Sequence, residues 1–141
     1  MTGPATEDPA REVWLLINDL VLDRGRRREV TEVTGLSFSR SRALRRIARR
    51  PMAMGELAAA LGIDPPNATV LVDDLEARGL ARRRPHPTDR RAKLVEPTRK
   101  GKAIAQRVDA ILNTPPPALS DLSTEDLDTL RRILKNVRPT T

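Results

Sequence analysis

The chain has 141 residues and a formal net charge of +7, with 38% hydrophobic and 32% charged residues. Its length fits one domain, and its positive charge suits a polyanionic partner such as nucleic acid. It has no cysteine, which excludes disulfides and thiolate metal sites, and its one histidine is His86. Since no phosphate-binding loop or dinucleotide motif is present, we expect no enzyme activity, no cofactor and no metal site.

Residues 1–8 are polar, and we expect them to be flexible. They carry no apolar stretch of the kind found in signal peptides. No apolar run anywhere in the chain approaches the ~18 residues that a membrane span needs. We therefore expect a cytoplasmic protein without a membrane partner.

A helix is predicted over residues 9–24. Its apolar residues, from Val13 to Leu22, cover most of its circumference, and such a helix must be buried on more than one side. We expect one of those sides to pack against a second copy of the chain. Gly25 and the arginines after it predict a break, followed by a polar linker to Gly35.

Ser37 is expected to cap the next helix, which runs to about Arg50. Six arginines lie between Arg40 and Arg50. We expect most of them to form a solvated face that holds nearby acids, with a few placed to contact phosphate. Residues 52–54 are expected to add a short strand to the hairpin described below.

Two short helices joined by a tight turn follow. The first is expected over residues 55–61 and ends at Gly62, since glycine readily takes the left-handed conformation found at helix ends. Asp64 is a typical N-cap, and Pro65 suits the first position of the second helix, which runs to about Arg78. The buried stripe of this second helix is predicted to be Ala68, Leu71, Val72 and Leu75, with Pro66, Asn67, Thr69, Val70 and Asp73 pointing away from it.

An arginine-rich hairpin is predicted next. Residues 81–84 and 92–95 pair as strands, and residues 85–91 form the tip, because two prolines and an aspartate suit a turn. Between Ala81 and Lys102 there are nine Lys or Arg and two acids. This excess of positive charge favours contact with a polyanion.

Two helices end the chain. Thr98 is expected to cap the first, which runs to about Asn113, and Ser123 is expected to cap the second. Apolar residues recur along the second at spacings of three and four: Leu127, Leu130, Ile133, Leu134 and Val137. That apolar face needs a partner helix.

Residues 56–101 resemble the winged helix-turn-helix of the MarR family of bacterial regulators. The resemblance rests on Glu56-Leu57-Ala58, Leu75-Glu76 with Gly79-Leu80, the wing pattern Asp89-x-Arg91, and the closing Thr98-x-x-Gly101. It implies a mainly α-helical fold with a small β-wing. Residues 36–97 then form the winged helix-turn-helix lobe, and residues 9–24 and 98–141 form flanking dimerisation helices.

The chain departs from the family pattern at three places. Ala53 stands where a threonine often completes a capping box with Glu56. Val70 and Asp74 stand at positions of the second helix that are often basic, and Pro97 replaces a leucine.

The resemblance implies a homodimeric, sequence-specific transcriptional regulator, and we expect a repressor that binds a pseudo-palindromic site in double-stranded DNA. In that family the second helix enters the major groove, Arg91 would reach the minor groove, and Asp89 would hold it. The expected DNA-contacting residues are Pro66, Asn67, Thr69, Val70, Asp73, Arg83, Arg84, Asp89, Arg90, Arg91 and Lys93. For Asp73, pairing with a nearby arginine is the favoured alternative to accepting a hydrogen bond from cytosine.

The resemblance also implies control by a small-molecule effector, an aromatic or amphipathic anion that releases the protein from DNA. Trp14 and Phe38 are candidates to line its pocket, although packing in the core is the more common role for such residues. Two other functions stay open: a winged-helix protein-interaction module without sequence-specific DNA binding, and a membrane-surface protein. The nine cations near the hairpin weigh against the interaction module, because such a module has no need of them. They weigh against the membrane-surface protein because they gather on a wing and not on one face of an amphipathic helix.

Overall fold

The computed structural model describes residues 8–21 and 24–138. It comprises two compact units, Met1–Ile111 and Leu112–Thr141. Flexibility was expected for residues 1–8, of which residues 1–7 lie outside the described residues. No helix in the two described ranges is long and apolar enough to cross a membrane.

The first helix, α1 (Pro9–Val21), begins after a capping residue that the sequence analysis did not identify. Asp8 Oδ1 accepts a hydrogen bond from the backbone N–H of Ala10 at 3.1 Å. None of the residues of α1 is buried within the chain. Trp14 is 61% exposed and Leu16 is 59% exposed. The apolar surface of this helix, which was expected to be buried on more than one side, is therefore exposed to solvent in the single chain.

The second helix, α2 (Arg24–Thr34), shows that the expected break at Gly25 and the linker after it were wrong. One glycine costs a helix only about 1 kcal/mol, and arginine is a good helix former. The segment also has an anchor, since Val30 is fully buried. The helix ends at Gly35, whose φ of 71° lies in the left-handed region.

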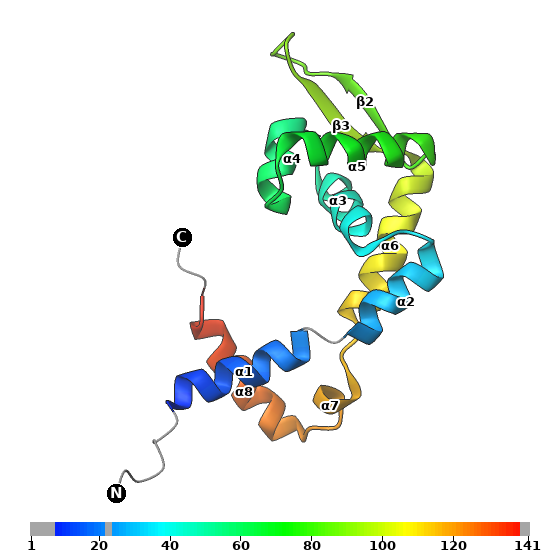
Figure 1. Cartoon of the computed structure of the whole chain (residues 1–141). Helices are drawn as coiled ribbons and strands as arrows, with labels where there is room; N and C mark the ends of the chain where they lie inside the picture. Colours follow the sequence, from blue (N-terminus) through cyan, green and yellow to red (C-terminus); the bar gives the residue numbers. More distant parts are fainter. Residues whose placement is uncertain (1–7, 22–23, 139–141) are drawn as a thin grey trace, which may run out of the picture. The chain divides into compact units, whose positions relative to one another are not determined.

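The helix-turn-helix has the predicted architecture. Its helices are α3 (Phe38–Arg49), α4 (Met54–Leu61) and α5 (Pro65–Ala77), which pack against one another (Figure 1). Asp64 Oδ1 caps α5 by accepting from the backbone N–H of Asn67 at 2.9 Å. Gly62 and Gly79 take φ values of 68° and 73° where α4 and α5 end.

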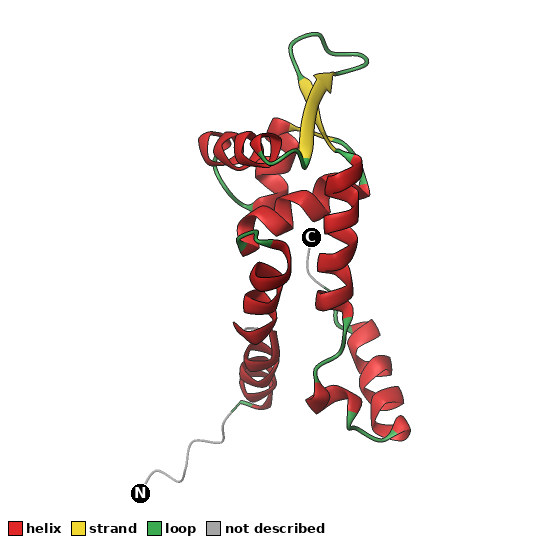
Figure 2. Cartoon of the chain, turned by 90° about the vertical axis from the view of Figure 1, so that its right-hand side faces the viewer, coloured by secondary structure: helices red, strands yellow, loops and turns green. Residues whose placement is uncertain are grey.

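The predicted hairpin is the larger part of a three-stranded antiparallel sheet, at one end of its unit (Figure 2). The strands are β1 (Met52–Ala53), β2 (Ala81–Pro85) and β3 (Lys93–Pro97), in the order β1-β3-β2. Met52 pairs with Val95, and Ala81 pairs with Pro97. The short third strand expected near Met52 is therefore confirmed.

The core of this unit lies between the helix-turn-helix and the sheet. Its buried residues include Leu36, Leu44, Ile47, Leu57, Val72, Leu75, Leu80 and Val95. Helix α6 (Arg99–Asn113) joins this core through Ala105. The Thr98 hydroxyl links the start of α6 to the end of α5, because it donates to the carbonyl of Gly79 at 2.7 Å and accepts from the N–H of Gly101 at 3.0 Å.

The second unit contains α7 (Pro117–Ser120) and α8 (Thr124–Asn136). As expected, Ser123 caps α8, with its Oγ accepting from the N–H of Asp126 at 3.1 Å. Neither helix has a buried residue. An open groove of about 400 Å³ runs along them, lined by Leu119, Leu127, Leu130, Arg131, Leu134 and Lys135.

Candidate nucleic-acid interface

The outer face of α5 is open to solvent near its N-terminus. Four residues named from the sequence are exposed there: Pro66, Asn67, Thr69 and Val70. The cap of the helix uses only the backbone N–H of Asn67. Within the described residues the amide of the Asn67 side chain has no hydrogen-bond partner, so it is free to bind an external group.

Asp73 belongs to an ion-pair network with the wing. Arg83 on β2 reaches back to α5, with Nη2 2.7 Å from Asp73 Oδ1 and Nη1 2.8 Å from Glu76 Oε1. Burial opposes the charged form of Arg83, but the hydrogen bonds to Asp73 and Glu76 outweigh it and raise the pKa of the guanidinium. The expected pairing of Asp73 with an arginine is confirmed, and Arg83 holds the wing to α5.

The neighbouring wing arginines share a different acid. The Nε atoms of Arg82 and Arg84 each lie 2.7 Å from a carboxylate oxygen of Glu96 on β3. Burial tends to raise the pKa of Glu96, but the hydrogen bonds from Arg82 and Arg84 outweigh this and hold it below its ordinary range. Arg84, which the sequence placed among the DNA contacts, therefore braces the two long strands of the wing.

Asp74 forms two ion pairs within the winged helix-turn-helix lobe. Its Oδ2 lies 2.5 Å from Arg40 Nε on α3 and 2.8 Å from Arg78 Nε. Burial raises the pKa of the Asp74 carboxyl, but the hydrogen bonds from Arg40 and Arg78 outweigh it and lower the pKa overall. The negative charge that departs from the family pattern is thus neutralised by two guanidinium groups, which tie α5 to α3.

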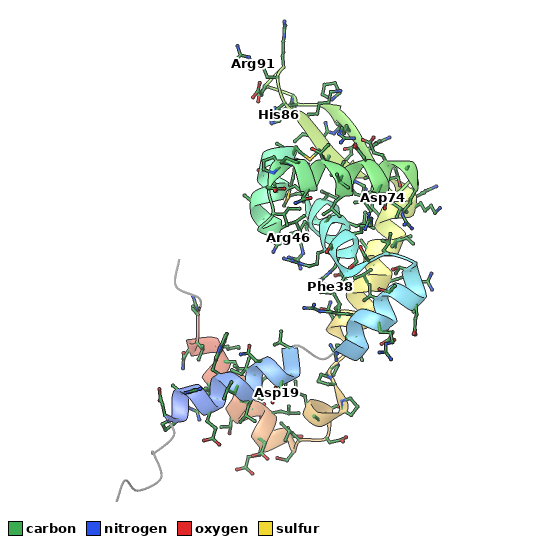
Figure 3. The ribbon with its side chains drawn as sticks, in the orientation of Figure 1. Asp19, Phe38, Arg46, Asp74, His86 and Arg91 are labelled. Carbon is green, nitrogen blue, oxygen red and sulfur yellow. The ribbon has the colours of Figure 1, made fainter. Side chains whose placement is uncertain are left out.

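The tip of the wing carries the cations that remain free. Arg90, Arg91 and Lys93 are exposed, and within the described part of the chain none of them has a carboxylate partner. Asp89 Oδ1 accepts from the backbone N–H of Arg91 at 2.9 Å, so Asp89 holds the backbone of Arg91 and not its guanidinium. Arg91 lies at the tip, away from the helices (Figure 3).

Two surface hollows flank these elements. One, of about 550 Å³, lies between α5 and the wing and is lined by Glu76, Ala81, Arg82, Arg83 and Lys93. The other, of about 90 Å³, is lined by Arg42, Arg45, Arg46 and Arg49 on α3. In this arginine face Arg45 pairs with Asp109 at 2.5 Å, as expected for a solvated face that holds some acids.

Helix α4 lacks the side-chain cap that a threonine would supply. Ala53 makes no capping hydrogen bond, and Glu56 instead pairs with Arg50 at 2.5 Å. The departure at Ala53 therefore has a visible structural consequence.

The two candidate ligand residues have different surroundings. Trp14 is exposed on α1, so it is not part of the core of its own chain. Phe38, at the start of α3, is half-buried, and the Arg27 guanidinium carbon lies 4.3 Å from the centroid of its ring. That position is typical of a cation–π contact.

His86 has a structural role in this interface that was not predicted from the sequence. The sequence offered no reason to assign it a structural role, but its Nδ1 accepts from two backbone N–H groups of the wing tip. Its place between Pro85 and Pro87 at a predicted turn is the only sequence signal for this role.

A helix-turn-helix followed by a two-stranded wing with a cationic tip defines the winged helix-turn-helix class of proteins. A model of the MarR family matches residues 34–92. The chain is similar to the transcriptional regulator BldR from Sulfolobus solfataricus, with 30% identity over 92% of this chain and 99% of that chain, and a TM-score of 0.63.

Two further solved structures agree. The transcriptional regulator Tm0710 from Thermotoga maritima has 31% identity, over 90% of this chain and 89% of that chain, with a TM-score of 0.67. The apo form of wild-type MarR from E. coli shares the fold, with 24% identity, 94% and 98% coverage and a TM-score of 0.75. The chain belongs to the MarR family, and the resemblance found in the sequence is confirmed.

Proposed function

We propose that this MarR-family transcriptional regulator is a homodimeric repressor that reads a pseudo-palindromic site in double-stranded DNA. The proposal rests on the different charge of two parts of the surface of the winged helix-turn-helix lobe. The exposed residues of the first turns of α5, from Pro66 to Val70, carry no charge, whereas the wing tip bears unpaired cations.

The exposed start of α5 suits the major groove. The Asn67 amide can donate to and accept from an adenine edge, and the methyl groups of Thr69 and Val70 can contact thymine. Pro66 lies beside them at the first turn. Because Asp73 and Asp74 are both bound to arginines, neither presents an unpaired charge to a phosphate.

The wing tip suits the DNA backbone and the minor groove. Arg90 and Lys93 have no carboxylate partner among the described residues and would neutralise phosphates, and Arg91 would enter the minor groove. Arg83 and Arg84 support this surface through their pairs with Glu76 and Glu96. We therefore assign them to positioning the wing, while the tip residues contact DNA.

A dimer would supply a second recognition helix. One recognition helix reads only a few base pairs, whereas two helices about 34 Å apart read a palindrome. The exposed apolar surfaces of α1 and α8 are suited to contact a second copy. Ile133 and Leu134 on α8 are each 48% exposed, and an apolar face of a helix is stabilised by burial against a partner.

An anionic effector fits the same proposal. Cations on α2 and α3, including Arg27 above the Phe38 ring and the arginine face beginning at Arg42, would attract an aromatic anion. Trp14 is a second aromatic surface for it. Binding of such an anion would release the protein from DNA.

A protein-interaction module is the alternative, and the free cations of the wing tip argue against it. A module that binds a neutral protein surface has no use for Arg90, Arg91 and Lys93 without partners. Its affinity would also lack the steep salt dependence of binding to a phosphate backbone.

Selection of a bound sequence from random duplex DNA, followed by titrations on the selected and a scrambled duplex, tests the proposal. Asn67→Ala leaves the cap of α5 intact, because the cap uses the backbone. It should weaken binding to the selected duplex only. Arg91→Ala should weaken specific binding by roughly 1–3 kcal/mol. Arg107→Ala, which removes an exposed cation on α6, is the matched control.

Two results would count against the proposal. If Asn67→Ala lowers both affinities equally, then α5 does not read bases. If no duplex is enriched by the selection and binding is insensitive to salt, the interaction-module alternative holds instead.

A further inference from the structure

The wing tip is organised around one side-chain atom, Nδ1 of His86. The backbone N–H groups of Thr88 and Asp89 donate to this nitrogen at 3.2 and 3.1 Å. The hydroxyl oxygen of Thr88 lies 3.3 Å from it. Neither backbone group belongs to the β2–β3 ladder, so the imidazole supplies the acceptor that the turn itself does not provide.

The hydrogen bonds continue from the imidazole to Arg91. Asp89, whose N–H binds His86, accepts from the backbone N–H of Arg91 through Oδ1 at 2.9 Å. The Asp89 carbonyl accepts from the N–H of Ala92 at 3.2 Å, and the N–H of His86 donates to the carbonyl of Ala92 at 3.3 Å. The ring and the backbone of Arg91 therefore belong to one hydrogen-bonded loop.

The direction of these bonds fixes the form of the ring. Two N–H donors converge on Nδ1, so Nδ1 must carry a lone pair, and the ring proton of the neutral imidazole must be on Nε2. An imidazolium has an N–H at both nitrogens and cannot accept. Histidine is the side chain that ordinarily changes charge between about pH 5 and 8.

We propose that His86 is a positioning residue of the wing: its neutral imidazole orders the tip and holds the backbone of Arg91, and a proton taken up at Nδ1 releases the tip. The effect on DNA binding rests on the proposed function, in which Arg91 enters the minor groove. The hydrogen bonds from the Thr88 and Asp89 N–H groups to His86 form in the free protein and do not depend on DNA.

The charges around the ring come from the wing itself, because the tip extends beyond the helices of its unit (Figures 1 and 3). The charged residues of the wing that lie nearest to His86 in the sequence are Arg84, Asp89, Arg90, Arg91 and Lys93. Protonation therefore has two opposed effects on DNA binding. It adds a positive charge near phosphates, and it removes the acceptor that orders Arg91. Salt screens the first effect, so the binding titrations are run at about 0.2 M salt to favour detection of the second.

Three substitutions separate the acceptor from the charge. His86→Asn places an amide oxygen near the position of Nδ1, and this oxygen accepts at every pH. His86→Ala removes the acceptor without adding charge. His86→Lys adds a permanent charge without an acceptor. The tip contributes no buried residue, so all three variants should keep the wild-type helix content and unfolding temperature.

Amide hydrogen exchange of the free protein tests the hold directly. Exchange is followed at about pH 8 and at about pH 5, on either side of the range in which histidine side chains ordinarily change charge. In the wild type, the Thr88 and Asp89 amides should be protected while the imidazole is neutral and unprotected once it carries a second proton. In His86→Asn they should stay protected relative to the random coil at both pH values. In His86→Ala they should be unprotected throughout. Equal protection in the wild type and His86→Ala at the higher pH would overturn the proposal.

The selected duplex gives the second readout. Relative to His86→Asn, the wild type should lose about tenfold in affinity as the pH falls, which corresponds to about one to two lost hydrogen bonds. His86→Lys should bind weakly at every pH. Parallel pH profiles for the wild type and His86→Asn, or tighter wild-type binding in acid, would contradict the positioning role. Should no duplex be enriched, the proposed function fails while amide protection still decides the role of His86.

Discussion

Arg82, Arg83 and Arg84 are adjacent in sequence but bind acids on two different elements. Successive side chains of a strand point to opposite faces, so Arg83 turns toward α5 while its two neighbours turn away. Arg82 is directly paired with Glu96 in the sheet, and Arg84 lies on the same face two residues on. One acid therefore holds both. The basic run that suggested phosphate contacts thus also braces the wing.

Gly101 shows how close packing restricts a single residue. Alanine is normally favoured over glycine in a helix by about 1 kcal/mol. At Gly101, however, an added Cβ would lie 2.9 Å from the carbonyl carbon of Leu80 and closer still to its oxygen. We expect Gly101→Ala to destabilise the protein by roughly 1–3 kcal/mol, measured by urea unfolding.

A matched control for this substitution lies in α4. A Cβ added at Gly55 would meet no atom within 4 Å, so Gly55→Ala should be neutral or stabilising by up to about 1 kcal/mol. If Gly101→Ala also stabilises, the close approach of α6 to Leu80 is not a real constraint.

At the scale of elements, α5 is fixed on two sides by its own acids. Asp73 and Glu76 bind Arg83 on the wing, and Asp74 binds Arg40 on α3. These pairs set the angle at which the helix and the wing would meet DNA together. The exposed residues from Pro66 to Val70, which would read base edges, carry no charge.

The Asp74 network makes a prediction about acid stability. The pKa of Asp74 is lowered in the folded state, so in acid the unfolded chain binds the proton more readily. The stabilisation is therefore complete above the ordinary carboxyl pKa of about 4 and is lost as the pH falls through the lowered value. Asp74→Asn should destabilise the protein near neutral pH, and its difference from the wild type should shrink toward about pH 2.

Urea unfolding midpoints across this pH range measure the effect. Glu32→Gln, which changes an exposed carboxylate on α2, is the matched control. A difference between Asp74→Asn and the wild type that stays constant with pH would show that the carboxylate does not stabilise the fold through its charge.

At the scale of the whole molecule, the chain leaves apolar surface uncovered in both units. Helices α1 and α8 have no buried residue, although each carries an apolar face. The core formed around α3, α4, α5 and the sheet is complete without them. This contrast separates the part of the protein that we propose reads DNA from the part that we assign to assembly.

Sedimentation at micromolar concentration should give about twice the chain mass of 15.7 kDa. Ile133→Glu on α8 should shift the protein toward monomer, because it places a charge in a face whose burial stabilises by about 1.5–3 kcal/mol per side chain. Asn136→Glu introduces the same charge at an exposed polar position of α8 and is the control. A monomeric wild type would falsify the dimer and the palindromic site together.

The sequence by itself determined the elements that local chemistry fixes. Asp64 caps α5 through an N–H three residues away, and Gly62 ends α4 because its φ is positive. The position of the wing followed from two strands and a turn between prolines. Such features depend on neighbours in the chain, so their residues could be named in advance. The winged helix-turn-helix fold was predictable for the same reason.

Tertiary structure decided what the charged residues do and whether a polar segment is helical. Arg40 pairs with Asp74, which lies 34 positions away in the sequence, and Arg45 pairs with Asp109, which lies 64 positions away. No local sequence pattern predicts either pair. Helix α2 was missed because its one fully buried side chain, Val30, acquires its neighbours only in the folded lobe. The role of His86 depends on a turn that brings two N–H groups to one ring nitrogen. Several acids are possible partners for each arginine in the sequence, and long-range packing decides which pairs form. It therefore decides which cations of the wing are held in ion pairs and which stay unpaired.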